Sequence, residues 1–127
     1  MLREDLRLYM FRKSSGRFVG STGLHRINWD VGRFDISYWI RTSESGQGLV
    51  TEAVHGIVQW ASDHLNARRI EIRCDARNLR SRKVAERAGF HLEAVLLQDE
   101  PDVEGLPSDS PIYVKLRLPN GEWGYPS

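Results

Sequence analysis

The chain has 127 residues, of which 40% are hydrophobic and 28% are charged, a composition typical of a soluble globular domain. This length leaves little room for a second core, so we predict one domain over residues 1–127. The formal net charge of +1 argues against a dedicated nucleic-acid-binding protein. No apolar run approaches the roughly 20 residues of a membrane span, so we expect no membrane contact.

Cys74 is the single cysteine of the chain. It excludes an intramolecular disulfide and favours a cytoplasmic location, where thiols stay reduced. Cys74 continues the apolar alternation of a strand, which indicates a packing role rather than a nucleophilic one. The N-terminal stretch "MLREDLRLYMFRK" carries charges where a signal peptide would have an apolar core.

The first third of the chain predicts an antiparallel meander. Leu6–Lys13, Phe18–Ile27 and Phe34–Ile40 have strand-forming composition and are separated by short turn sequences. In the third of these, alternation places Phe34 and Ile36 on one face and Asp35 on the other.

The stretch "SESGQGLVTEAV" separates this meander from a helix. Apolar residues at three- and four-residue steps predict an amphipathic helix from about Leu49 to Leu65. Gly46 and Gly48 stand where a side-chain cap is usual, which suggests a turn whose backbone N–H groups approach an anion at the helix N-terminus. The residues after Gly48 lack the Lys-Ser/Thr of a nucleotide-hydrolase loop, and Thr51 replaces the third glycine of a dinucleotide fingerprint.

The second half of the chain predicts a crossover followed by a hairpin. "RIEIRCD" alternates as a strand, and its position after a long helix predicts parallel pairing with the preceding strand. "NLRSRKVAERAGF" predicts a short helix with Asn78 as N-cap and Gly89 beyond its C-terminus. Phe90–Leu97 and Ile112–Leu118 are predicted strands joined by an acidic loop. The expected order is β-β-β-α-β-α-β-β, an α+β layered domain with a mixed sheet.

Charge is unevenly distributed along this second half. Arg68 to Arg87 contains eight Lys/Arg and three acids, whereas Asp99 to Ser110 contains five acids and no Lys/Arg. One interpretation is a solvated helix and a solvated loop. The other is a site that meets a phosphate-bearing partner on one side and a cationic partner on the other.

Together, "GQGLVTEAV" and the later "NLRSRKVAERAGF" resemble the GNAT acetyltransferase superfamily, and they are most similar to the branch that acetylates N-termini of ribosomal proteins and related amines. The resemblance covers nearly the whole chain, from Leu6 to Leu118. It implies a centrally splayed sheet, in which the strand ending in "YWIR" diverges from its parallel neighbour. It also implies acetyl-CoA as acyl donor, with no metal.

The resemblance further implies a role for individual residues. The pyrophosphate of acetyl-CoA would be bound by Gly46, Gln47, Gly48, Leu49 and Val50, and the pantetheine arm by the backbone of Ile40 and Arg41. Asn78 would anchor that arm near the thioester, and Ser81 would lie beside the sulfur and donate a proton to the departing thiolate. Arg80, Arg82 and Lys83 are candidate partners for the ribose phosphate.

The amine acceptor must lose a proton before it attacks, so a general base is expected near the splayed strands. Candidates on or beside the central strands are Asp35, His25, Glu71 and Asp75. We favour Asp35 as the catalytic base, because it lies on the strand expected to carry the acyl chain. The alternative for a carboxylate on such a strand is a structural ion pair with a nearby arginine such as Arg73.

This chain departs from the family pattern at its N-terminus. The family normally begins with a strand and two helices that wall the acceptor pocket, and the first strand here corresponds to the family's second. We therefore expect one sheet face without helical cover, with Tyr9, Phe11 and Trp39 exposed. This predicts a homodimer or a strand-exchanged oligomer.

The function that these features favour is an N-acetyltransferase that moves an acetyl group from acetyl-CoA to a primary amine by direct attack. The acidic loop would favour a cationic acceptor such as a peptide N-terminus or a polyamine. The alternative is an acyl-CoA-binding or interaction module that keeps the cofactor cradle but lacks a competent acceptor pocket.

Overall fold

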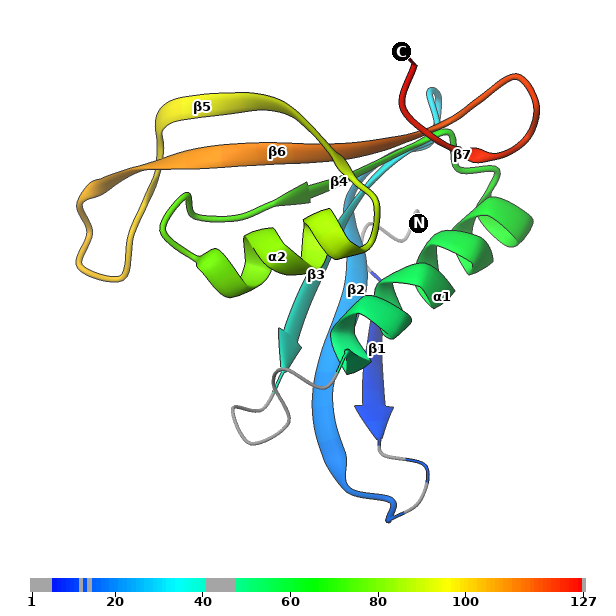
Figure 1. Cartoon of the computed structure of the whole chain (residues 1–127), viewed down its shortest axis with the longest axis horizontal. Coiled ribbons are helices and arrows are strands. Elements are labelled where there is room, and N and C mark those ends of the chain that lie inside the picture. The colour runs from blue at the N-terminus through cyan, green and yellow to red at the C-terminus, as the bar shows by residue number, and fades with distance from the viewer. Residues whose placement is uncertain (1–5, 12, 14, 41–47, 127) are drawn as a thin grey trace.

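The computed structural model describes residues 6–11, 13, 15–40 and 48–126 (Figure 1). Its elements are β1 Leu6–Phe11, β2 Phe18–Asn28, β3 Arg33–Ile40, α1 Leu49–Leu65, β4 Arg69–Arg73, α2 Leu79–Arg87, β5 His91–Pro101, β6 Pro107–Arg117 and β7 Trp123–Gly124. All strands belong to one sheet with the order β1-β2-β3-β4-β6-β5, and β7 pairs with β6. The predicted α+β class is confirmed.

The sheet is mixed in the predicted way. β1, β2 and β3 form an antiparallel meander, and β3 and β4 are parallel. Helix α1 makes the crossover between that parallel pair, and its observed bounds are the predicted ones. The β5–β6 hairpin then completes the sheet, with β6 antiparallel to β4.

The parallel pair opens into a splay. β3 and β4 pair only from Arg33 to Ile36 against Arg69 to Ile72. Beyond that point β3 continues beside β2 alone, as far as Ile40. In Figure 1 the arrowheads of β3 and β4 point in clearly different directions. The predicted central divergence of the sheet is therefore present.

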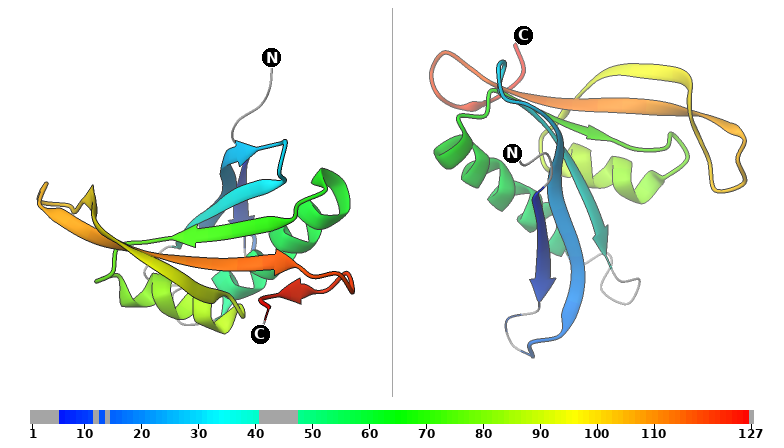
Figure 2. Two further views of the ribbon diagram at one scale, coloured as in Figure 1. Left: turned by 90° about the horizontal axis from the view of Figure 1, so that it is seen from above. Right: turned by 180° about the vertical axis from the view of Figure 1, so that it is seen from behind.

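Both helices cover the same face of the sheet (Figures 1 and 2). The core lies between that face and the helices, and its fully buried members include Phe34 and Ile70 of the sheet, Val54 of α1 and Ala85 of α2. Burying these side chains stabilises the fold by about 1.5–3 kcal/mol for each large one. Neither helix of the described chain has the length and apolar run that a membrane crossing requires.

The predicted acidic loop is mostly strand, which corrects the sequence interpretation. β5 extends to Pro101 and β6 begins at Pro107, so only a short turn separates them. In that turn, Asp102 Oδ1 accepts hydrogen bonds from the backbone N–H groups of Glu104 and Leu106 at 2.8 and 2.9 Å. Pro101 is tolerated because β5 is an edge strand, and Pro107 is tolerated because it is the first residue of β6. The two-residue β7 was not predicted.

The other sheet face carries no helix within the described chain (Figure 2). Tyr9, Phe11 and Trp39 are 61%, 60% and 54% exposed, which confirms the predicted exposure. Phe18 links them, with ring centroids 5.7 Å from Phe11 and 6.0 Å from Trp39. We call these four side chains the aromatic patch.

Candidate functional site

Helix α1 begins at a glycine rather than at a side-chain cap. Gly48 is the N-cap residue and has φ 73°, with no side-chain hydrogen bond to the first turn. Its carbonyl accepts the first helical bond, from Glu52 N at 3.0 Å. The N–H groups of Leu49 and Val50 stand at this uncapped N-terminus, where a helix favours an anion. Among the other predicted cradle residues, Arg41, Gly46 and Gln47 lie outside the described residues, as does the side chain of Ile40.

Helix α2 begins with the predicted cap and fixes a serine next to the splay. Asn78 Oδ1 accepts a hydrogen bond from Ser81 N at 3.1 Å. The Ser81 hydroxyl donates to Tyr38 Oη at 3.0 Å, and the Tyr38 hydroxyl donates to the Ser81 carbonyl at 2.8 Å. Burial raises the pKa of Tyr38 to about 12. Tyr38 therefore stays protonated and joins the splayed end of β3 to the first turn of α2 by uncharged hydrogen bonds.

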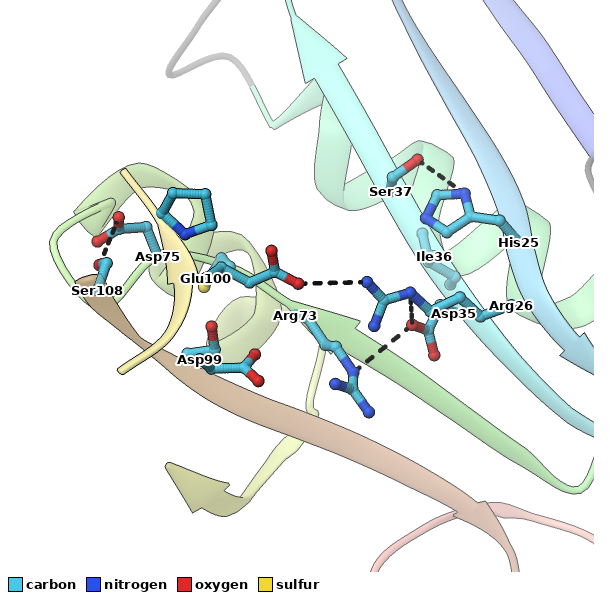
Figure 3. Close-up of a pocket in the computed structure, with 13 residues that line it drawn as sticks. His25, Arg26, Asp35, Ile36, Ser37, Arg73, Asp75, Asp99, Glu100 and Ser108 are labelled. Carbon is cyan, nitrogen blue, oxygen red and sulfur yellow. Dashed lines mark hydrogen bonds and ion pairs between the residues drawn. The ribbon is translucent and has the colours of Figure 1, made fainter. Parts of the chain in front are cut away.

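A polar pocket of about 360 Å³ opens beside the splay (Figure 3). Strands β2, β3 and β4 supply one side of it, and the β5–β6 hairpin supplies the other. Its lining residues are His25, Arg26, Asp35, Ile36, Ser37, Arg73, Cys74, Asp75, Asp99, Glu100, Pro101, Ser108 and Ser110. Three of the four predicted base candidates, Asp35, His25 and Asp75, thus line one pocket.

Asp35 and Glu71 form a buried carboxylate pair beside this pocket. They are direct partners in the parallel pairing of β3 and β4, and each residue is only 4% exposed. Burial, and next the negative charge of Glu71, raise the pKa of Asp35 from 3.8 to about 6, against the opposing effect of Arg73 and Arg26. A carboxyl group with this pKa exchanges a proton near neutral pH, as general acid–base chemistry requires.

A network of alternating positive and negative side chains extends from this pair across the open face. Arg26 lies 3.8 Å from Asp35 and 3.6 Å from Glu100, and Arg73 lies 3.6 Å from Asp35 and 3.3 Å from Glu71. Figure 3 shows Arg26 reaching Glu100 across the pocket. Beyond Glu71 this network of side chains continues through Arg69 to Glu93 and the Tyr125 hydroxyl. Asp35 therefore also has the ion pair with Arg73 that was the alternative to a role as base.

The hairpin wall of the pocket is held in place at the loop that follows β4. The Ser108 hydroxyl donates to Asp75 Oδ2 at 2.6 Å, and Ala76 N donates to the Asp109 carbonyl at 2.9 Å. Arg77 contacts Asp75 at 3.4 Å and Asp102 at 2.5 Å. The Ser108 hydrogen bond, with Arg77 next, lowers the pKa of Asp75, so Asp75 is an ionised structural residue and a poor base.

The basic residues of α2 separate into two groups. Arg82 is directed inward, where its guanidinium donates to Tyr113 Oη at 3.0 Å and to the Ala76 carbonyl at 3.1 Å. Arg80 and Lys83 are exposed. Of the three predicted phosphate partners, these two remain available on the surface.

Cys74 lies at the pocket and packs against the core. Burial raises the pKa of its thiol, which disfavours the nucleophilic thiolate and agrees with the predicted packing role. Among the described residues, no group of His, Cys, Asp and Glu side chains has an arrangement that could hold a metal ion.

Sequence comparison gives a family match. The acetyltransferase (GNAT) domain matches residues 2–91. The chain is 34% identical over 93 residues to the probable N-acetyltransferase YjcK of Bacillus subtilis, which covers 72% of this chain and 51% of that protein. It is 31% identical over 94 residues to the ribosomal-protein-serine acetyltransferase of Escherichia coli, covering 74% and 52% respectively. The chain thus spans about half the length of these curated relatives.

Comparison with solved structures agrees with this family match. The microcin C7 self-immunity acetyltransferase MccE, crystallised with acetyl-CoA and AMP, superposes with a TM-score of 0.81 at 30% sequence identity. That alignment covers 89% of this chain and 61% of MccE.

Proposed function

The chain belongs to the GNAT acetyltransferase family, and from this premise we propose that it transfers an acetyl group from acetyl-CoA to a primary amine by direct attack. The observation that carries the proposal is the splay between β3 and β4, with the glycine-led N-terminus of α1 after β3 and the capped N-terminus of α2 after β4. Two exposed helix starts and unpaired strand backbone suit a long, phosphate-bearing acyl donor.

The donor side is assigned to the described residues as follows. Gly48, Leu49 and Val50 would bind the pyrophosphate of acetyl-CoA through backbone N–H groups, and this fits the absence of a side-chain cap at Gly48. The backbone of Ile40 and the side chain of Asn78 would bind the pantetheine arm. Acetyl-CoA supplies the activated acyl group, and the cradle orients it.

The acceptor side is assigned to the open face. Asp35 would take the proton that the amine loses as its nitrogen bonds to the acyl carbon. Ser81 would give its hydroxyl proton to the sulfur as the carbon–sulfur bond breaks, and would regain a proton from solvent. A thiolate with a pKa of about 8.5 needs little assistance to leave, so one hydroxyl is sufficient.

The pocket favours a cationic acceptor, such as a peptide N-terminus or a polyamine. Asp99 and Glu100 line it on the hairpin side. Within the described chain, the carboxylate of Asp99 has no hydrogen-bond or ion-pair partner of its own. A cationic group of the acceptor would supply that partner.

Calorimetry with CoA tests cofactor binding, and thiol release from acetyl-CoA tests acetyl transfer to the amine. We expect CoA to bind, and thiol release to depend on an added amine from a panel of peptides and polyamines. CoA binding with no release on any acceptor would support an acyl-CoA-binding module instead. Failure to bind CoA would remove both interpretations.

We also propose that the protein associates through the aromatic patch, since four neighbouring aromatic rings on a sheet face favour burial. A second copy would cover the patch in a homodimer or a strand-exchanged oligomer. Sedimentation at micromolar concentration should give the mass of more than one chain, and Trp39→Lys should shift it towards a single chain. A single-chain mass in the unmodified protein would refute the proposal.

A further inference from the structure

The buried carboxylate pair is asymmetric in how its two members are neutralised. Glu71 has both oxygens within hydrogen-bonding distance of guanidinium groups, at 2.7 Å from Arg69 and 3.3 Å from Arg73. Asp35 has only longer approaches, at 3.6 Å from Arg73 and 3.8 Å from Arg26. Charge-assisted hydrogen bonds strongly favour the ionised form of a carboxyl group. Glu71 is therefore the member of the pair that arginines bind directly.

The two carboxylates are also too close to be independent. Asp35 and Glu71 are register partners on adjacent strands, whose backbones lie about 4.8 Å apart. Two neighbouring carboxylates in a buried site disfavour simultaneous ionisation, so one of them keeps a proton to higher pH. Since two arginines donate hydrogen bonds to Glu71 while Asp35 has only the longer approaches, we assign that proton to Asp35, whose pKa is raised.

We propose that Glu71 is a positioning residue, whose fixed negative charge keeps the exchangeable proton of the pair on Asp35. The inference rests on the proposed function, in which Asp35 accepts the proton of the amine. Glu71 does not line the pocket, so it acts on the reaction through Asp35. In its absence, Asp35 would face arginines without an opposing anion and would be a weaker base.

Other charged groups around Asp35 do not supply this effect. On β2, the positive charge of Arg26 lowers the pKa of Asp35. His25, also on β2, is the register partner of Asp35 but is hydrogen-bonded to Ser37. From β4, Arg73 is shared between the two carboxylates. From the hairpin, Glu100 faces Arg26, and the remaining acids that line the pocket are Asp75 and Asp99. Glu71 is the carboxylate that is in register with Asp35 and whose charge raises the pKa of Asp35.

Carboxyl titration followed by 13C NMR tests the inference without requiring turnover. In the unmodified protein, the Asp35 carboxyl carbon, assigned by its loss in Asp35→Asn, should titrate with a midpoint near 6. A titration near 6 on Glu71 instead of Asp35 would overturn the proposal.

The variant Glu71→Gln removes the charge while keeping the shape of the side chain. The Asp35 midpoint should fall by roughly one pH unit, and the acidic limb of kcat/KM against pH should fall with it. Glu93→Gln is the matched control, because Glu93 contacts the same Arg69 at 2.5 Å; it should move the Asp35 midpoint by less than about 0.3 unit. An unchanged or raised midpoint in Glu71→Gln contradicts the role of Glu71.

Failure of this inference is distinguishable from failure of the proposed function. If Asp35→Asn keeps the activity and its pH profile, Asp35 is not the base, whatever the NMR titration gives. If Asp35→Asn loses the acidic limb while Glu71→Gln leaves the limb in place, only the role of Glu71 is wrong.

Discussion

The contact that joins β3 to α2 at the splay is uncharged, whereas the contacts around the carboxylate pair on the open side are ionic. Tyr38 and Ser81 meet through hydroxyl and carbonyl groups, whereas Asp35 and Glu71 lie among arginines. Residues on opposite faces of β3 supply the two environments, because side chains alternate between the faces of a strand and Asp35 and Tyr38 are three residues apart. In the proposed function, a single strand thus presents a hydroxyl network to the acyl donor and a titrating carboxyl group to the acceptor.

The largest effect that separates the two sides is expected from Asp35→Asn. We expect kcat/KM at pH 7 to fall about 100-fold, since this variant removes the proposed base. Activity of the unmodified protein should fall below about pH 6, where Asp35 becomes protonated, and the variant should lack that limb. Steady-state kinetics across pH with the exposed control Asp30→Asn measures both; an unchanged profile would exclude Asp35.

A smaller loss of activity is expected from Ser81→Ala on the helix side. We expect kcat to fall about tenfold, because the thiolate is already a competent leaving group. The KM for acetyl-CoA should change less than about twofold, since the Asn78 cap uses the Ser81 backbone N–H and remains. A loss confined to KM would assign Ser81 to binding rather than to proton donation.

The raised pKa of Asp35 should also make the free energy of unfolding depend on pH. Its pKa is raised in the folded state, so the folded protein holds the proton more tightly than the unfolded chain. That contribution is present at low pH and is lost as the pH rises through about 6. Asp35→Asn should therefore raise the free energy of unfolding by about 1–2 kcal/mol at pH 8 and by much less at pH 4.5. Urea unfolding at both values measures the difference, and an equal effect at both would contradict it.

The smallest expected effect concerns the donor cradle. Gly48→Ala should destabilise the protein by about 1 kcal/mol, because Gly48 has φ 73° while an added Cβ would meet no atom within 4 Å. Gly56→Ala is the matched control in the same helix, also without a contact within 4 Å, and should stabilise by up to about 1 kcal/mol. Thermal unfolding compares them; equal shifts would show that the left-handed start of α1 is not required.

Local signals predicted the helices well. The bounds of α1 follow from its apolar repeat and from Gly48, and α2 follows from the Asn78 cap and from Gly89, whose φ is 83°. These features act within a few residues of the chain, so the sequence alone displays them. The parallel pairing of β3 with β4 followed from α1, because a long crossover predicts parallel pairing. The position of β6 between β4 and β5 was not predicted.

The charged side of the site was less predictable, since it depends on contacts between distant segments. Asp35 and Glu71 were both candidates, but their pairing and burial depend on the register between β3 and β4. The inward turn of Arg82 depends on Tyr113 of β6. The outer part of the predicted hairpin was mistaken for a loop because its prolines and acids have the composition of one. Asp102 closes the actual turn by accepting from the N–H groups of Glu104 and Leu106.

Strand β5 has every residue from His91 to Pro101 exposed to solvent, whereas Ile70, Glu71 and Ile72 of β4 are all buried. Its attachment to the domain therefore depends mainly on the ladder with β6 and on surface ion pairs such as Arg69–Glu93 and Arg26–Glu100. Amide hydrogens of β5 should consequently exchange with deuterated water well before those of β4. We expect the outer boundary of the pocket to open locally while β4 stays folded, which would let a bulky acceptor of the proposed reaction enter without global unfolding.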